Sequence, residues 1–174
     1  REQRPDIIYI FSKDILRHRR AQKEDAVWLK KGEEYKDETL SVRAFGSTDV
    51  GVSFLLQASG KKIFHAGDLN NWHWMDESTE AEWKGAEKNF LHELDDLYAY
   101  TPEVDVAMFP VDPRLGKEYM RGAGQFVTKI KTHIFVPMHF TPEYAKANAF
   151  RDFAEAHGVR FVSLTHRGQK IEIE

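Results

Sequence analysis

The 174-residue sequence contains no cysteine, which excludes disulfides and thiolate metal sites. Any bound metal would need His and carboxylate ligands. No apolar run reaches the roughly 18 residues that a membrane span requires. The beginning of the sequence also lacks the pattern of a signal peptide. We therefore expect a soluble, cytoplasmic protein without a membrane partner.

The sequence also lacks an excess of positive charge. It has 25 Lys and Arg against 28 Asp and Glu, a formal net charge of −3 and a pI of about 6.3. Binding to nucleic acid requires basic residues clustered on one face. One basic cluster, Arg17–Arg20, is followed closely by Glu24 and Asp25, a pattern typical of a solvated helix face. We expect a single domain spanning residues 1–174 and no nucleic-acid partner.

The first third of the chain is rich in strand patterns. Residues 6–11 (DIIYIF) form a β-branched and aromatic run that predicts a buried strand. Residues 51–67 (GVSFLLQASGKKIFHAG) alternate apolar and polar side chains and predict a hairpin turning at residues 58–62. This part of the chain is expected to be mostly antiparallel β.

Helices and strands alternate in the remainder. Thr79 and Glu82 have the spacing of a capping box, and apolar residues then recur at helical intervals as far as Leu97. Thr141 and Pro142 predict another helix start, with Gly158 at its end. The other expected elements are strands at 104–110, 133–140, 159–164 and 170–174 and a helix at 122–130. This order predicts a layered α/β domain with a mixed sheet.

Two side chains that suit metal binding come directly after apolar strands. Asp68 follows the strand that ends in "KIFHA", and His139 ends the strand "IFVPMH". Functional groups collect at the carboxyl ends of strands in such sheets. Both are ligand types for zinc, manganese or iron, and a carboxylate can bridge two ions. Two alternatives remain open: Asp68 as a turn or helix cap, and His139 as a core or rim histidine.

Four neighbours are further candidates. His65, three residues before Asp68, is expected to orient that ligand rather than bind metal itself. His73, between two Trp residues, is a candidate catalytic residue in the pocket. Asp112 and Arg114, in "FPVDPRLG", are candidates to face a substrate from the same rim. The two prolines equally describe a rigid turn in which Asp112 bonds its own backbone.

Three segments together resemble a known family. They are "GVSFLLQASGKKIFHAGDLN", "VDVAMFPVDPRLG" and "IFVPMHF", in this order. They resemble the C-terminal two-thirds of a metallo-β-lactamase-fold metal-dependent hydrolase, especially of the branch with the sugar-lactone and phosphoester enzymes. The resemblance runs from about Ile7 to the end, and "HAGD" is its most specific part. It implies a four-layer αββα sandwich with mixed sheets, Asp68 as bridging metal ligand and His139 as ligand of the second metal.

The sequence departs from that family in two ways. It contains no His-x-His-x-Asp-His string, so an N-terminal segment carrying that motif is expected to be absent. The loop "RAFGSTDVG" also lacks the family's histidine and has Ser47, Thr48 and Asp49 in its neighbourhood. One face of a sheet would then be uncovered, and we expect another segment or a homo-oligomer to cover it.

The resemblance implies a hydrolase in which a metal-activated hydroxide attacks an ester, lactone or phosphoester bond of a small molecule. Zn²⁺ is the expected metal, with Mn²⁺ or Fe²⁺ also suitable. The alternative is a non-catalytic ligand-binding protein of the same fold with a degenerate metal site. A structural or assembly domain is a third reading, since a fold alone does not give a function.

Overall fold

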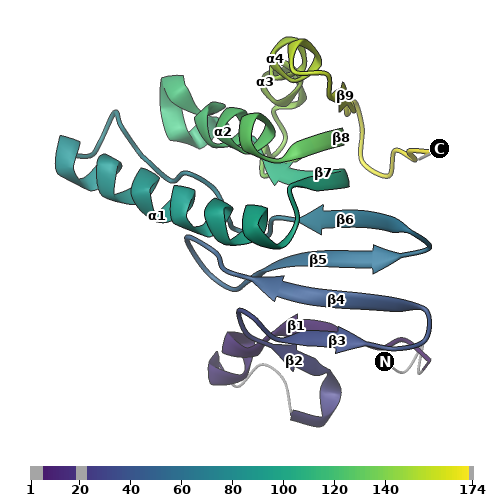
Figure 1. The fold of residues 1–174 in the computed structure, drawn as a ribbon. Coiled ribbons are helices and arrows are strands. Elements are labelled where there is room, and N and C mark those ends of the chain that lie inside the picture. The colour runs from purple at the N-terminus through teal and green to yellow at the C-terminus, as the bar shows by residue number, and fades with distance from the viewer. Residues whose placement is uncertain (1–5, 19–22, 173–174) are drawn as a thin grey trace.

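A seven-stranded mixed sheet organises the protein. The computed structural model describes residues 6–18 and 23–172 (Figure 1). In spatial order the strands are β3 (Glu34–Lys36), β4 (Leu40–Phe45), β5 (Ser53–Ala58), β6 (Lys61–His65), β7 (Glu103–Pro110), β8 (Lys131–Met138) and β9 (Arg160–Phe161). Strands β3 to β6 are antiparallel to their neighbours, whereas β6 to β9 are parallel. The predicted hairpin and the predicted mixed sheet are confirmed.

Three helices cover one face of this sheet (Figure 1). They are α1 (Glu80–Tyr100), α2 (Arg121–Lys129) and α4 (Arg151–Ala156). The predicted capping box is present, because the Thr79 side chain accepts from the Glu82 N–H and Glu82 accepts from the Thr79 N–H. Between the layers, the ring of Phe126 lies 4.6 Å from that of Phe109 and 5.5 Å from that of Phe64. This aromatic core holds the helices against the strands.

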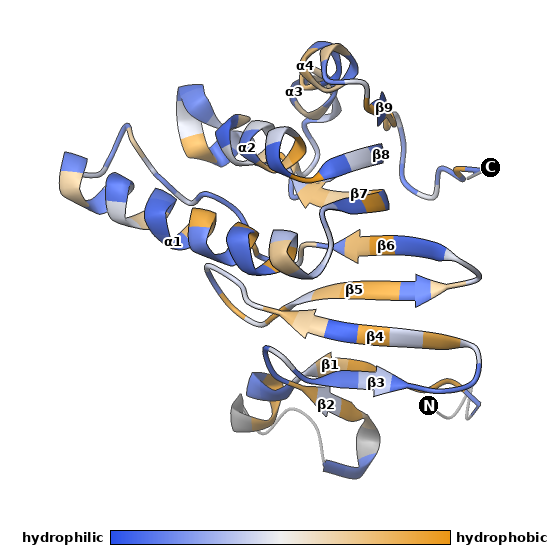
Figure 2. Cartoon of the chain, in the orientation of Figure 1, coloured by the Kyte–Doolittle hydropathy of each residue, from blue (hydrophilic) through white to orange (hydrophobic). Residues whose placement is uncertain are grey.

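The opposite face of the sheet is only partly covered. Register pairs Phe54 with His65, and Ile63 with both Leu56 and Val106, so these side chains share that face. Phe54, Leu56 and Ile63 are half-buried. Figure 2 shows an apolar stretch on β5 and another next to the arrowhead of β6, with polar residues where β6 begins. The sheet and its helices thus form one β layer and one α layer of the expected sandwich.

A small parallel sheet flanks β3. It pairs β1 (Ile10–Ser12) with β2 (Val27–Leu29), next to the 3-10 helices η1 (Lys13–His18) and η2 (Lys23–Asp25). The buried strand predicted for residues 6–11 is wrong, because Ile7 and Ile8 are exposed and the strand begins only at Ile10. The partner strand has only three residues and pairs with Ile10 to Ser12, so the beginning of the apolar run lies outside the pairing. The side chains of Arg17–Arg20 lie outside the described residues.

The C-terminal elements differ from those predicted. The helix expected from Thr141 begins at Tyr144, because the chain first turns, with the Glu143 N–H donating to the Phe140 carbonyl. It is also divided into α3 (Tyr144–Asn148) and α4. The strand expected at 159–164 is only β9, because the Leu164 backbone bonds the Asn148 side chain instead of β8. Residues 170–172 form no strand, and 173–174 lie outside the described residues.

Across the part of the chain that the structure describes, no helix combines the length and the apolar character needed to cross a membrane.

Candidate metal centre

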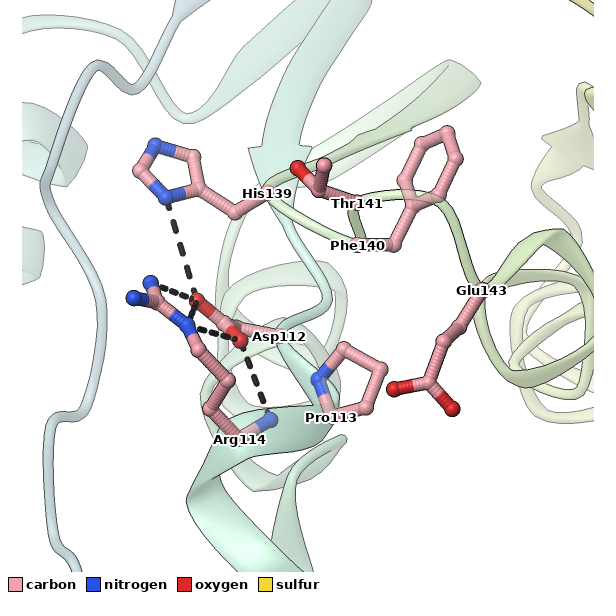
Figure 3. A pocket seen from close by; sticks show the side chains of 7 residues that line it. All are labelled: Asp112, Pro113, Arg114, His139, Phe140, Thr141 and Glu143. Carbon is pink, nitrogen blue, oxygen red and sulfur yellow. Dashed lines mark hydrogen bonds and ion pairs between the residues drawn. The ribbon is translucent and has the colours of Figure 1, made fainter.

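The two predicted metal ligands meet at one edge of the sheet. Asp68 follows β6, Asp112 follows β7 and His139 follows β8, and these three strands are parallel neighbours. The Nε2 atom of His139 lies 3.1 Å from Oδ1 of Asp68. Its other ring nitrogen, Nδ1, lies 3.9 Å from Oδ2 of Asp112 (Figure 3). The predicted convergence of Asp68 and His139 is therefore present in the fold.

A glycine turn sets the direction of Asp68. Gly67 has a φ of +57°, and a Cβ atom there would lie 2.9 Å from the Val52 carbonyl oxygen. A side chain is therefore disfavoured at this position both by the backbone angle and by the close approach. The turn is closed by the Leu69 N–H, which donates to the Ala66 carbonyl. It brings Asp68 to the rim directly after β6.

The candidate ligands line a cavity of about 420 Å³. Its lining residues are Thr48, Asp49, Asp68, Trp72, Trp74, Arg114 and His139. The rings of Trp72 and Trp74 are stacked with centroids 6.5 Å apart, and Trp72 lies 5.9 Å from the His139 ring. The cavity thus combines an acidic edge with an aromatic wall. From the sequence, Asp49 was named only as one of three residues near the position of the family's missing histidine, without a role.

Asp112 and Arg114 form one unit at the start of η3 (Pro113–Glu118). Asp112 is fully buried and accepts from the Arg114 backbone N–H at 3.0 Å and from its Nε at 2.9 Å. It also pairs with Nη2 of Arg114. These hydrogen bonds raise the pKa of Arg114 above its usual value. The alternative of a turn stabilised by Asp112 is thus present, while Arg114 remains largely exposed and lines the cavity.

His65 lies at the exposed end of β6. Its Nδ1 accepts the Gly67 N–H at 3.1 Å, so it stabilises the turn that leads to Asp68. Desolvation, together with the charge of nearby His139, lowers the pKa of His65. No hydrogen bond joins His65 to Asp68 in the structure, so its support of Asp68 acts through the backbone of the turn.

His73 is buried and lies apart from the cavity lining. Its Nδ1 accepts the Met75 N–H, and its Nε2 lies 3.1 Å from the Glu118 carbonyl oxygen. Both nitrogens are therefore engaged, which joins the loop before α1 to the end of η3. A catalytic role for His73 stays a prediction that this position does not support.

Asp68 and His139 fit part of a site for Zn²⁺, Mn²⁺ or Fe²⁺. Their donor atoms are close enough to share one ion, and both are suitable ligand types. Zinc sites use three or four protein ligands, however. Within residues 6–18 and 23–172, no three His, Asp or Glu side chains converge on a point suitable for an ion. The described residues thus supply part of a metal site.

The charges of the cavity favour a cation. Asp112 offsets the charge of Arg114, which leaves the carboxylates of Asp49 and Asp68 with only the His139 ring, 3.1 Å from Asp68, as a titratable partner in the lining. Two like charges that share a partly enclosed cavity repel each other. One divalent cation would balance them.

Solved structures with a similar fold were found, whereas the sequence matches no protein-family model and no curated protein. A protein from Parabacteroides distasonis assigned as a metal-dependent hydrolase has a TM-score of 0.62 and 15% identity over 91% of this chain and 64% of its own. The metallo hydrolase Igni18 from Ignicoccus hospitalis has a TM-score of 0.59 and 16% identity over 93% and 67%. The metallo-β-lactamase fold protein YhfI from Bacillus subtilis has a TM-score of 0.52 and 8% identity over 86% and 59%.

The chain spans about two thirds or less of the length of these structures. At these identities the similarity concerns the fold. The chain has the metallo-β-lactamase fold.

Proposed function

We propose that this chain is part of a metal-dependent hydrolase that acts on an ester, lactone or phosphoester bond of a small molecule. The observation that carries the proposal is the 3.1 Å approach of His139 Nε2 to Asp68 Oδ1 at the edge of the sheet. Support comes from the excess of negative charge in the cavity and from a fold shared with metal-dependent hydrolases.

The residues of the cavity divide into two groups. Asp68 and His139 would hold the ion, with His65 stabilising the turn that positions Asp68. Trp72 and Trp74 form a wall that would exclude water from one side of the substrate. A divalent ion bound there would supply the Lewis-acid chemistry that such a hydrolysis requires.

Further protein atoms would have to complete the site. The half-buried apolar face with Phe54, Leu56 and Ile63 lies on the same side of the sheet as His65. A further segment or a second copy of the chain, packed over this face, would reach the rim of the site. We propose that such a neighbour provides the remaining ligands, with Zn²⁺ as the first metal to test and Mn²⁺ and Fe²⁺ next.

The test is hydrolysis of an aryl ester, a lactone and a phosphodiester by protein loaded with each metal. We expect metal-dependent turnover of at least one substrate, with a loss of at least about 100-fold in Asp68→Ala and His139→Ala. His133→Ala is the matched control, because His133 is exposed on β8, the strand that His139 follows, and pairs with Glu103. Turnover that is equal with and without metal would refute the proposal. So would the same turnover in wild type and in all three variants.

A non-catalytic ligand-binding protein is the second candidate. The lack of a third convergent ligand among the described residues favours it. In that case Asp68→Ala would leave binding of a small ligand in the Trp72 and Trp74 cavity intact. Loss of metal and ligand binding together in this variant would exclude the second candidate.

A further inference from the structure

The guanidinium of Arg114 uses only one of its edges. Asp112 accepts from Nε and Nη2, which form the side edge of the group. No other hydrogen bond or ion pair of this side chain is found in the described part of the chain. The end edge, formed by Nη1 and the second hydrogen of Nη2, therefore has donors without a protein partner.

The position of this free edge is fixed although the side chain is exposed. The Arg114 side chain is 68% exposed, whereas that of its partner Asp112 is 0% exposed. An exposed arginine ordinarily samples many rotamers, and holding it in one costs entropy. A buried carboxylate offsets that cost, because leaving the carboxylate unpaired would be strongly unfavourable. Asp112 is thus a positioning residue for Arg114.

Arg114 lies beside the candidate metal ligands. Arg114 lines the 420 Å³ cavity with Asp68, Trp72 and His139. It also lines a smaller cavity of about 190 Å³, which includes His139 and Thr141 (Figure 3). Arg114 thus lines two cavities that share His139, whereas neutralising Asp112 alone would not require this position.

We propose that the end edge of Arg114 binds a carboxylate or phosphate group of the substrate, so that the hydrolase acts on an anionic small molecule. Two parallel N–H donors match two oxygens of either group. The stacked Trp72 and Trp74 would contact a flat apolar part of the same molecule. The reaction in this inference rests on the proposed function, whereas the binding of the anion does not.

The charge of the cavity predicts how binding depends on metal. Without an ion, Asp49 and Asp68 repel an anion, and a divalent cation removes this repulsion. Anions should therefore bind more tightly to Zn²⁺-loaded protein than to metal-free protein. Any direct contact between the anion and zinc is the same in wild type and in the Arg114 variants. The ratio of the variant and wild-type dissociation constants therefore measures the contribution of Arg114 alone.

The test is calorimetric titration of metal-free and Zn²⁺-loaded protein with phenyl phosphate, benzoate and benzyl alcohol. The variants are Arg114→Gln, Arg114→Lys and the control Arg160→Gln, an exposed arginine on β9. Arg114→Lys keeps a cation next to Asp112, so it decides the outcome if the glutamine variant fails to fold. We expect both Arg114 variants to bind the two anions about ten- to a hundredfold more weakly, with benzyl alcohol and the control unchanged.

A larger loss for phenyl phosphate than for benzoate would assign a phosphate, and the reverse order a carboxylate. Equal affinities of wild type and both Arg114 variants for the anions would overturn the inference. So would wild-type protein that binds neither anion. Failure of the wild type to bind Zn²⁺ would count against the proposed function instead, and the metal-free titration would still test Arg114.

Discussion

Gly122, in the first turn of α2, packs against the loop that follows Asp68. A Cβ atom at this glycine would lie 2.0 Å from Oδ1 of Asn70 and 3.0 Å from the backbone nitrogen of Asn71, whereas ordinary contacts begin at 3.4 Å. Asn70 is fully buried, and neither amide atom has a hydrogen-bond partner in the described structure. Its side chain therefore has little room to move away.

Gly85 in α1 provides a matched comparison, because a Cβ atom there would meet nothing within 4 Å. Replacing glycine by alanine inside an exposed helix ordinarily stabilises a protein by about 0.5–1 kcal/mol. Overpacking a buried contact costs about 1–3 kcal/mol. Gly85→Ala should thus be stabilising. Gly122→Ala should be destabilising by up to about 2 kcal/mol once the helix gain of about 1 kcal/mol is subtracted from the overpacking cost.

Urea unfolding followed by tryptophan fluorescence measures both free energies. The expected result is a change of opposite sign in the two variants, with unchanged m values. The Thr48 hydroxyl bonds both the carbonyl and the N–H of Asn70, so displacement of Asn70 should also change chemical shifts at Thr48 in the cavity. A Gly122→Ala protein as stable as Gly85→Ala would refute the packing of this loop on α2.

Two further predictions concern the helical layer. Hydrogen bonds from Arg121 and Gln125 lower the pKa of Glu87 in the folded protein. The ionised carboxylate therefore stabilises the fold fully above the unfolded-state pKa near 4.5. This stabilisation is lost as the pH falls through the lowered folded-state pKa. Glu87→Gln should therefore cost about 1–2 kcal/mol at pH 7, with the difference from wild type shrinking in urea titrations below pH 4.5; a constant difference down to pH 3 would contradict this. Phe126→Ala, in the core, should cost about 3–5 kcal/mol, whereas Phe153→Ala, at a partly exposed ring, should cost less than half as much. Equal thermal shifts for the two phenylalanine variants would count against the assigned core.

Local chemistry made part of this fold predictable. The capping box at Thr79, the hairpin through residues 51–67 and the strands before Asp68 and His139 all follow from signals within a few residues. The convergence of Asp68 and His139 followed from the rule that parallel strands share one edge for their carboxyl ends. Those predictions required no knowledge of distant contacts.

Other features depended on contacts that no local pattern contains. Ile7 and Ile8 read as a buried strand, yet their partner strand is too short to pair with them. From the sequence, Asp112 and Arg114 were equally compatible with a rigid turn and with a position facing a substrate. In the structure Arg114 takes part in the turn and keeps one edge of its guanidinium free. His73 sat between two cavity residues in sequence but faces the end of η3 in space.

The most direct test of the metal centre is calorimetric titration with Zn²⁺ of wild type, Asp68→Ala, His139→Ala and the control His133→Ala. Two ligands that share one ion should each be needed, so both site variants should bind Zn²⁺ at least about tenfold more weakly, and His133→Ala should match wild type. Equal Zn²⁺ affinities in all four proteins would contradict the assignment of Asp68 and His139 as metal ligands.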